Sequence, residues 1–213
     1  MQRLRLKFSR GEQLKYLSHL DLMRLWERAL RRAEILPAYS EGFSPHPKIS
    51  LAAPLQVGVT SSAELMDVFL EGHVTPGVFT RKVSEQLPQG VGIVEVTSVN
   101  VQGPSLQSRL RQAEYSVELE TDKGSDQIES EIKALLASEQ LPWHHSRDTG
   151  ERFYDLRALI DDLWLVEKKE GSCLIGMRLR CDSGGAGRPE QVAKALGFSA
   201  TPGSIERTKL IFE

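Results

Sequence analysis

Cysteine is almost missing from this sequence, because its 213 residues include only Cys173 and Cys181. The two are eight positions apart in one predicted strand, where a separation of roughly 27 Å rules out a disulfide between them. Two thiols are also fewer than the cysteines that hold an iron–sulfur cluster. We therefore expect the chain to carry no iron–sulfur centre and no other cofactor.

Long hydrophobic runs are missing too. No stretch approaches the roughly 20 apolar residues that a membrane-spanning helix needs, and the contents of 40% hydrophobic and 26% charged residues are those of an ordinary globular protein. The first ten residues, MQRLRLKFSR, alternate apolar with basic positions and lack the uninterrupted apolar core of a secretory signal. We expect a soluble, cytoplasmic protein with no membrane partner.

The net charge of −2 conceals an uneven distribution. Residues 1–50 contain ten Lys or Arg against five Asp or Glu, a local charge of +5, whereas the other 17 basic and 24 acidic residues carry −7. The N-terminal quarter is a candidate anion-binding region. The alternative is that these charges form a solvated face.

Hydrophobic periodicity predicts a β-α-β-β-α-β order in the first half. Residues 2–8 alternate as a half-buried strand, and residues 18–35 change to helical spacing, with Ser18 as N-cap and Asp21 as its capping-box partner. The other predicted elements are strands at 48–55 and 63–72, a helix at 75–87 and a strand at 91–101. This is the element order of a ferredoxin-like domain.

The second half repeats that order with an extra strand or hairpin. Its predicted elements are strands at 114–121, around 142–147, within 153–181 and at 204–212, and helices at 125–138 and 188–197. The prediction is an α+β protein of tandem ferredoxin-like domains, with a first domain at 1–102, a linker at 103–112 and a second domain at 113–213.

Two motif-rich segments carry a family resemblance. YLSHLDLMRLWERALRRA and YSEGFSPHPKISLAAPLQVGVTSSAELMDV resemble the bacterial radical S-adenosylmethionine (SAM)-linked family of uncharacterised proteins, with its Ser-His-Leu-Asp helix start and Gly-Phe-Asn-Pro-His-Pro loop. Ser44 stands where that family has Asn, and Gln56 where it has a second Pro. The resemblance covers about residues 3–70 and is weaker beyond.

Members of that family stand alone or are fused to the C-terminus of radical SAM proteins. The resemblance implies a partnership with a separately encoded radical SAM protein, and a role in RNA modification or translation with RNA or ribosomal components as partners. The predicted architecture is also similar to the RAMP-type CRISPR RNA-processing proteins, a likeness of fold alone.

The segment SPHPK predicts a stiff presentation of His46 between Pro45 and Pro47, with Lys48 beside it. A histidine held this way can act as an acid, a base, a metal ligand or a hydrogen-bond donor, unless it only caps a turn. His19, at the first position of the predicted helix, is expected to approach His46. The catalytic candidates are therefore His46, His19 and Lys48.

Those two histidines, with Asp21 and with Glu64 or Asp67, are the only candidate metal ligands that the sequence groups together. No dense ligand motif accompanies them, so we expect no metal site.

A row of arginines follows on the predicted helix, where Arg24, Arg28 and Arg31 share one face at i, i+4 and i+7. Such a row suits a phosphate backbone, with aromatic residues stacking on unpaired bases. The candidate residues for nucleic-acid or partner binding are Arg24, Arg28, Arg31, Tyr39, Phe43 and Lys48, with Arg3, Arg5, Lys15, Tyr16 and Arg32 as additional contacts. The alternative is again a solvated helix face.

The segment SGGAGRPEQV places Gly184, Gly185 and Gly187 before a helix, with Arg188 alongside. Exposed glycine amides there are candidates to bind an anion, although a plain flexible loop is the alternative.

These features favour a non-catalytic accessory module that binds RNA or a ribonucleoprotein and presents it to a radical SAM enzyme. Two alternatives stay open. One is a metal-independent RNA-processing enzyme that uses His46 or His19 as acid or base. The other is a protein-interaction scaffold.

Overall fold

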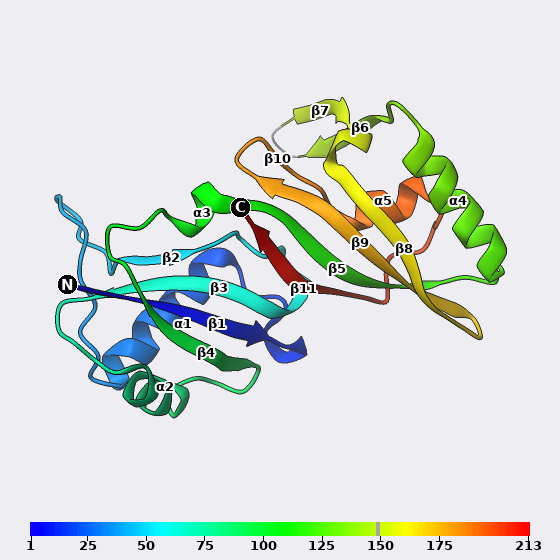
Figure 1. Ribbon diagram of the computed structural model, residues 1–213. Helices are drawn as coiled ribbons and strands as arrows, with labels where there is room; N and C mark the ends of the chain where they lie inside the picture. The colour runs from blue at the N-terminus through cyan, green and yellow to red at the C-terminus, as the bar shows by residue number, and fades with distance from the viewer. Residues whose placement is uncertain (148–149) are drawn as a thin grey trace. The chain divides into compact units, whose positions relative to one another are not determined.

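The computed structural model describes residues 1–147 and 150–213 (Figure 1). The protein is mixed α+β, with a large and mostly antiparallel sheet and few helices. It divides into two compact units: unit 1 comprises residues 1–110 with Glu213, and unit 2 comprises residues 111–212. Within the described ranges, no helix is both long enough and apolar enough to cross a membrane.

Unit 1 follows the predicted order of strands and helices. Its elements are β1 (Gln2–Arg10), η1 (Glu12–Leu14), α1 (His19–Arg32), β2 (Ile49–Leu51), β3 (Thr60–Leu70), α2 (Pro76–Ser84), β4 (Val91–Val99) and α3 (Leu106–Arg109). The strands lie in the order β2-β3-β1-β4, and every neighbouring pair is antiparallel.

The helices of unit 1 begin where their capping residues predict. The backbone N–H of Asp21 donates to the hydroxyl of Ser18 over 3.2 Å, and that hydroxyl donates to the Asp21 carboxylate over 2.7 Å. In α2, Thr75 accepts a bond from the N–H of Val78, and Pro76 occupies the first helical position. The N-cap predicted at Ser18 is therefore confirmed, and Thr75 caps α2 in the same way.

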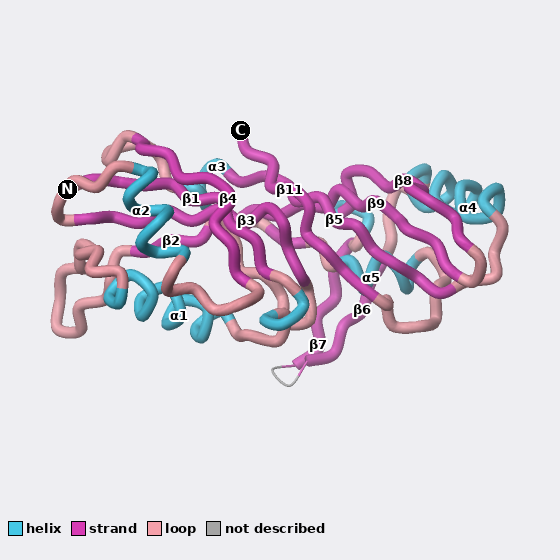
Figure 2. The backbone as a smooth tube through the Cα atoms, turned by 90° about the horizontal axis from the view of Figure 1, so that it is seen from below, coloured by secondary structure: helices cyan, strands magenta, loops and turns pink. Residues whose placement is uncertain are grey.

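The core of unit 1 lies between one face of the sheet and the helices α1 and α2 (Figure 2). Leu4, Leu6 and Phe8 alternate toward this face and are fully buried. The Phe8 ring meets the Trp26 indole of α1 edge-on, with 5.1 Å between the ring centroids. Since side chains alternate along a strand, Arg3, Arg5 and Lys7 belong to the opposite face of the sheet.

Unit 2 has the predicted elements and the extra hairpin. They are β5 (Leu110–Glu120), α4 (Ser125–Ala137), β6 (Pro142–Arg147), β7 (Gly150–Asp155), η2 (Arg157–Leu159), β8 (Ile160–Lys169), β9 (Ser172–Asp182), β10 (Gly185–Ala186), α5 (Pro189–Ala195) and β11 (Ser204–Phe212). The main strands lie in the order β8-β9-β5-β11, and β6 and β7 form a separate two-stranded sheet. Both cysteines lie buried in β9, and they form no disulfide with each other.

The segment at 103–112 was expected to be a linker, and it contains α3 and the start of β5. The guanidinium of Arg3 holds the preceding turn, because it donates to the carbonyls of Gly103 over 2.8 Å and of Pro104 over 2.9 Å. This part of the chain is therefore attached to unit 1 by hydrogen bonds.

Candidate functional site

The outer face of α1 presents three arginines in a line, Arg24, Arg28 and Arg31, which we call the basic row. All three are exposed. Arg24 approaches Asp21 at 3.5 Å, whereas Arg28 and Arg31 make no ion pair with any described residue. At a rise of 1.5 Å per residue, the row spans about 10 Å along the helix axis. Its guanidinium groups are available to an external anion.

Arg3, Arg5 and Lys15 do not extend this row. Arg3 is only 3% exposed, and it shares the buried carboxylate of Asp67 with Arg5 on the sheet face opposite α1. Lys15 is paired with Glu12 at 2.7 Å, and the hydrogen bond with that carboxylate raises the pKa of Lys15. The expectation that Arg3 and Arg5 contact the same phosphate backbone as the basic row is therefore wrong, whereas for Lys15 it stays a prediction.

Residues 38–48 form a hairpin, called the Pro-rich hairpin below. The N–H of Lys48 donates to the carbonyl of Ala38 over 2.7 Å, and Tyr39 pairs with Pro47. Ser40 and His46 exchange two further bonds: the Ser40 N–H donates to the His46 carbonyl over 2.8 Å, and the His46 N–H donates to the Ser40 hydroxyl over 3.0 Å. The backbone of His46 is held by cross-strand bonds as well as by its prolines.

The side chains of the hairpin point largely into solvent. Phe43 has a relative exposure of 111% and Tyr39 of 50%, and the imidazole of His46 is exposed with no hydrogen bond to a described residue. Lys48 is half-buried. Gly42, next to Phe43, has φ +123°, a conformation that strains any residue with a Cβ. The hairpin thus presents aromatic and basic groups to the outside.

His19 and His46 are not brought together. The segment before α1 lies at the start of β3, where the N–H of Gly58 donates to the carbonyl of Lys15 over 2.7 Å. The Pro-rich hairpin joins the far end of β3, where Ala38 donates to Phe69. Eleven residues of strand span about 35 Å, so the expected site with both histidines is wrong.

Among the described residues, no cluster of metal-ligating side chains replaces it. Asp67 is occupied by two guanidinium groups, and the described residues contain no group of three or more His, Cys, Asp or Glu that suits a metal ion.

The glycine-rich loop of unit 2 already binds a carboxylate of the protein itself. The Asp182 carboxylate accepts from the amides of Gly184 over 2.7 Å and Gly185 over 3.1 Å, and from Arg180 over 2.8 Å. These contacts, with that from Arg180 the strongest, lower the pKa of Asp182.

The other two residues of the predicted anion site are no better placed. The amide of Gly187 donates to the carbonyl of Arg180, and Arg188 precedes a helix of only seven residues. The amides expected to bind an external anion are therefore engaged within the protein.

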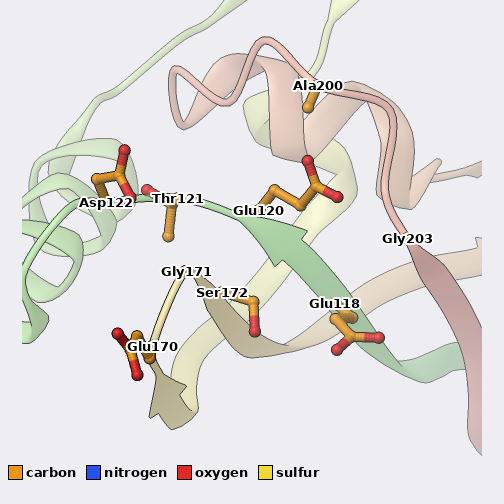
Figure 3. Close-up of a pocket in the computed structure, with 9 residues that line it drawn as sticks. All are labelled: Glu118, Glu120, Thr121, Asp122, Glu170, Gly171, Ser172, Ala200 and Gly203. Atoms are coloured by element: carbon orange, nitrogen blue, oxygen red, sulfur yellow. The ribbon is translucent and has the colours of Figure 1, made fainter.

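Unit 2 also contains a pocket of about 640 Å³ that the sequence did not reveal (Figure 3). Four acidic side chains surround it, those of Glu118, Glu120, Asp122 and Glu170. Three of them alternate along the end of β5 and just beyond it, a pattern visible in the sequence, but Glu170 joins them only through the pairing of β5 with β9. A pocket with these charges repels phosphate, so the candidate RNA-binding site stays in unit 1.

The β6–β7 hairpin holds an aromatic pair that was also missed. His144 stacks on Phe153 with 4.7 Å between ring centroids, and its Nε2 lies 3.4 Å from a Glu151 oxygen. The pairing depends on strand register, which the sequence alone does not provide.

Comparison with known proteins gives a family and a fold. The model of a family described as an uncharacterized protein conserved in bacteria (DUF2344) matches residues 3–189. No curated protein is significantly similar in sequence.

Among solved structures, a chain of a Cbf5-Nop10-Gar1 complex is similar over 98% of this chain and 48% of its own length, with a TM-score of 0.51 and 14% identity. A chain of the archaeal box H/ACA sRNP Nop10-Cbf5 complex covers 97% and 46%, with a TM-score of 0.46 and 13% identity. The chain spans about half the length of these solved chains, and the similarity concerns the fold alone.

Proposed function

We propose that this chain, which belongs to the DUF2344 family of bacterial proteins whose model it matches, is an accessory module that binds RNA through the basic row. The observation that carries the proposal is the exposed line of Arg24, Arg28 and Arg31 on α1, in which two of the three guanidinium groups have no internal ion pair among the described residues.

The dimensions of the basic row suit a phosphate backbone. One strand of a nucleic acid carries a phosphate about every 3.4 Å of helix axis, so a row of about 10 Å faces about three phosphates. Arginine binds phosphate through two parallel N–H groups, and contacts of this kind supply affinity without reading sequence. The α1 face therefore positions an RNA strand and leaves its selection to other residues.

The fold is part of the same proposal. The strands lie in the order β4-β1-β3-β2 in unit 1 and β11-β5-β9-β8 in unit 2. Both are the same order, fourth-first-third-second, when the main strands are numbered along the chain within each unit. This shared order supports a RAMP-like pair of ferredoxin-like domains at 1–102 and 113–213. Such domains occur in many functional contexts, so the fold alone does not assign the function.

The second partner in the proposal is a separately encoded, cytoplasmic radical SAM protein that modifies the bound RNA. Its support is the sequence resemblance at the Ser-His-Leu-Asp helix start and the Pro-His-Pro loop. If the two proteins, produced together, do not co-purify in the presence or absence of RNA, this part of the proposal is lost, although RNA binding by the chain itself can still hold.

A binding experiment tests the RNA contact directly. We expect a variant with Arg24→Gln, Arg28→Gln and Arg31→Gln to bind a short fluorescent RNA about 100-fold more weakly than the wild type at about 0.1 M salt, from the loss of three phosphate contacts. The matched control carries three exposed substitutions in unit 2 with the same change in net charge, Lys133→Gln, Lys169→Gln and Lys194→Gln. Equal affinities of the two variants contradict the proposal and favour a protein-interaction scaffold.

A further inference from the structure

We propose that the tip of the Pro-rich hairpin selects unpaired RNA, with Phe43 stacking on an extruded base. This inference rests on the proposed function, since it assigns a substrate class to the RNA that the basic row holds. It predicts a preference for a duplex that ends in a single strand over a fully paired duplex.

Phe43 is positioned by the hairpin that carries it. Two hydrogen bonds between Ser40 and His46 hold the two arms of the hairpin together. At the other end of the hairpin, Ala38 and Lys48 both form backbone hydrogen bonds with Phe69 of β3. Only the tip, residues 41–45, lies beyond these bonds. Within it Pro45 has a fixed φ and restricts Ser44 before it, so the C-terminal side of the tip has little freedom of its own, whereas Gly42 turns the chain with a positive φ.

Both faces of the Phe43 ring are accessible. The side chain is fully exposed and makes no ring contact with a described residue. Single exposed apolar residues are common and need no explanation by themselves. Here, however, the exposed ring stands at the end of a braced hairpin, which lowers the entropy lost when a ligand stacks on it.

Exposed basic side chains lie at the same end of unit 1 as the hairpin. Figures 1 and 2 show the hairpin beyond the C-terminal end of α1, where Arg31 and Arg32 are exposed. On the hairpin itself, His46 is exposed and Lys48 is half-buried, and the one acidic residue, Glu41, is exposed in the tip. Because phosphates accompany every base, an aromatic ring beside cations fits a nucleotide better than it fits an apolar pocket of a protein.

The geometry also connects the ring to the basic row. Five residues separate the last turn of α1 from Ala38, and Ile35 closes the helix by donating to the carbonyl of Leu30 over 3.0 Å. Phe43 follows Ala38 by five residues and so lies within about 18 Å of it. An RNA strand that leaves the basic row therefore needs only a few nucleotides to reach the tip of the hairpin. In a duplex the bases are stacked on one another and are not accessible to the ring.

The test compares two RNAs, a short duplex and the same duplex extended by a single-stranded overhang that contains 2-aminopurine. Wild-type protein is expected to bind the overhang RNA more tightly and to quench its fluorescence. Phe43→Leu is expected to lose roughly 5- to 150-fold in affinity for the overhang RNA, the range measured when a stacking ring is removed. Its affinity for the duplex should be unchanged, and Phe43→Tyr should behave like the wild type.

The controls separate this inference from the proposed function. Phe153→Leu removes another largely exposed ring, in unit 2, and should leave both affinities unchanged. Neutralising the basic row should weaken the binding of both RNAs to the same extent. If the wild type binds both RNAs equally, or if Phe43→Leu binds the overhang RNA as tightly as the wild type, the inference is overturned while RNA binding by the row stands. If the wild type binds neither RNA, the proposed function itself fails.

Discussion

Replacing Asp67 by Asn should destabilise unit 1 more than any surface substitution. The Asp67 carboxylate is 1% exposed and accepts bonds from Arg3 over 2.5 and 3.1 Å and from Arg5 over 2.8 and 3.0 Å. Arg3 is itself 3% exposed. Removing the negative charge therefore leaves a buried guanidinium without a counter-charge.

The size of the effect follows from that burial. Breaking a buried ion pair by removing one partner costs about 3–5 kcal/mol of unfolding free energy. Arg3 keeps its carbonyl acceptors at Gly103 and Pro104, and Arg5 is 22% exposed and regains water. We therefore expect a loss of about 3 kcal/mol, at the lower end of that range.

Urea denaturation of the wild type and Asp67→Asn measures this loss. Asp161→Asn is a matched control, because that carboxylate is 43% exposed and contacts Arg178 only at 3.6 Å; an exposed pair of this kind contributes about 1 kcal/mol or less. The amide of Gly103 should also exchange hydrogen faster in Asp67→Asn, because Arg3 would hold its turn less firmly. A loss below about 1 kcal/mol, equal to the control, would refute the reasoning.

Three further substitutions have effects that the structure predicts. Gly176→Ala places a Cβ 2.0 Å from the Trp164 indole, so the ring must move; we expect a loss of about 1–3 kcal/mol and altered tryptophan fluorescence. Arg180 is the main cause of the lowered pKa of Asp182 in the folded protein. This shift stabilises the folded state above the unfolded pKa of about 3.9, and the stabilisation is lost as the pH falls through the lower pKa of the folded state. Asp182→Asn should therefore reduce the difference between the urea midpoints at about pH 7 and about pH 3. Trp26→Phe should cost less than about 1.5 kcal/mol in urea denaturation, because the buried indole N–H has no acceptor among the described residues.

Each of these has an outcome that counts against it. Gly72→Ala is the control for Gly176→Ala, since nothing lies within 4 Å of its added Cβ, and equal losses would mean that the indole yields without cost. An unchanged acid sensitivity in Asp182→Asn would show that other carboxylates dominate. A loss in Trp26→Phe as large as in Trp26→Ala, about 3–5 kcal/mol, would mean that the indole nitrogen is bonded in solution.

Local features were predictable from the sequence. Ser18 and Thr75 cap their helices through bonds to residues three positions away, and the buried stripe of α1 follows from its helical period. Asp182 also binds amides only two and three positions on, as Asp often does in turns, and the spacing of Asp and Gly contained that signal.

Features that depend on distant pairing were not predictable. The contact of Arg3 with Asp67 spans 64 positions and follows from the register of β1 with β3. The expected approach of His19 to His46 was wrong because α1 carries the chain about 20 Å along the sheet before the hairpin begins. A helix of this length separates the groups that precede it from those that follow it.

The salt dependence of RNA binding measures how many phosphate contacts the basic row makes. Each phosphate contact to a single strand adds about 0.7 to the slope of log K against log salt concentration. We expect the slope for the variant neutralised at Arg24, Arg28 and Arg31 to be shallower than that of the wild type by about 2. The unit 2 control should keep the wild-type slope. Identical slopes for the wild type and the row variant would show that α1 does not contact the RNA backbone.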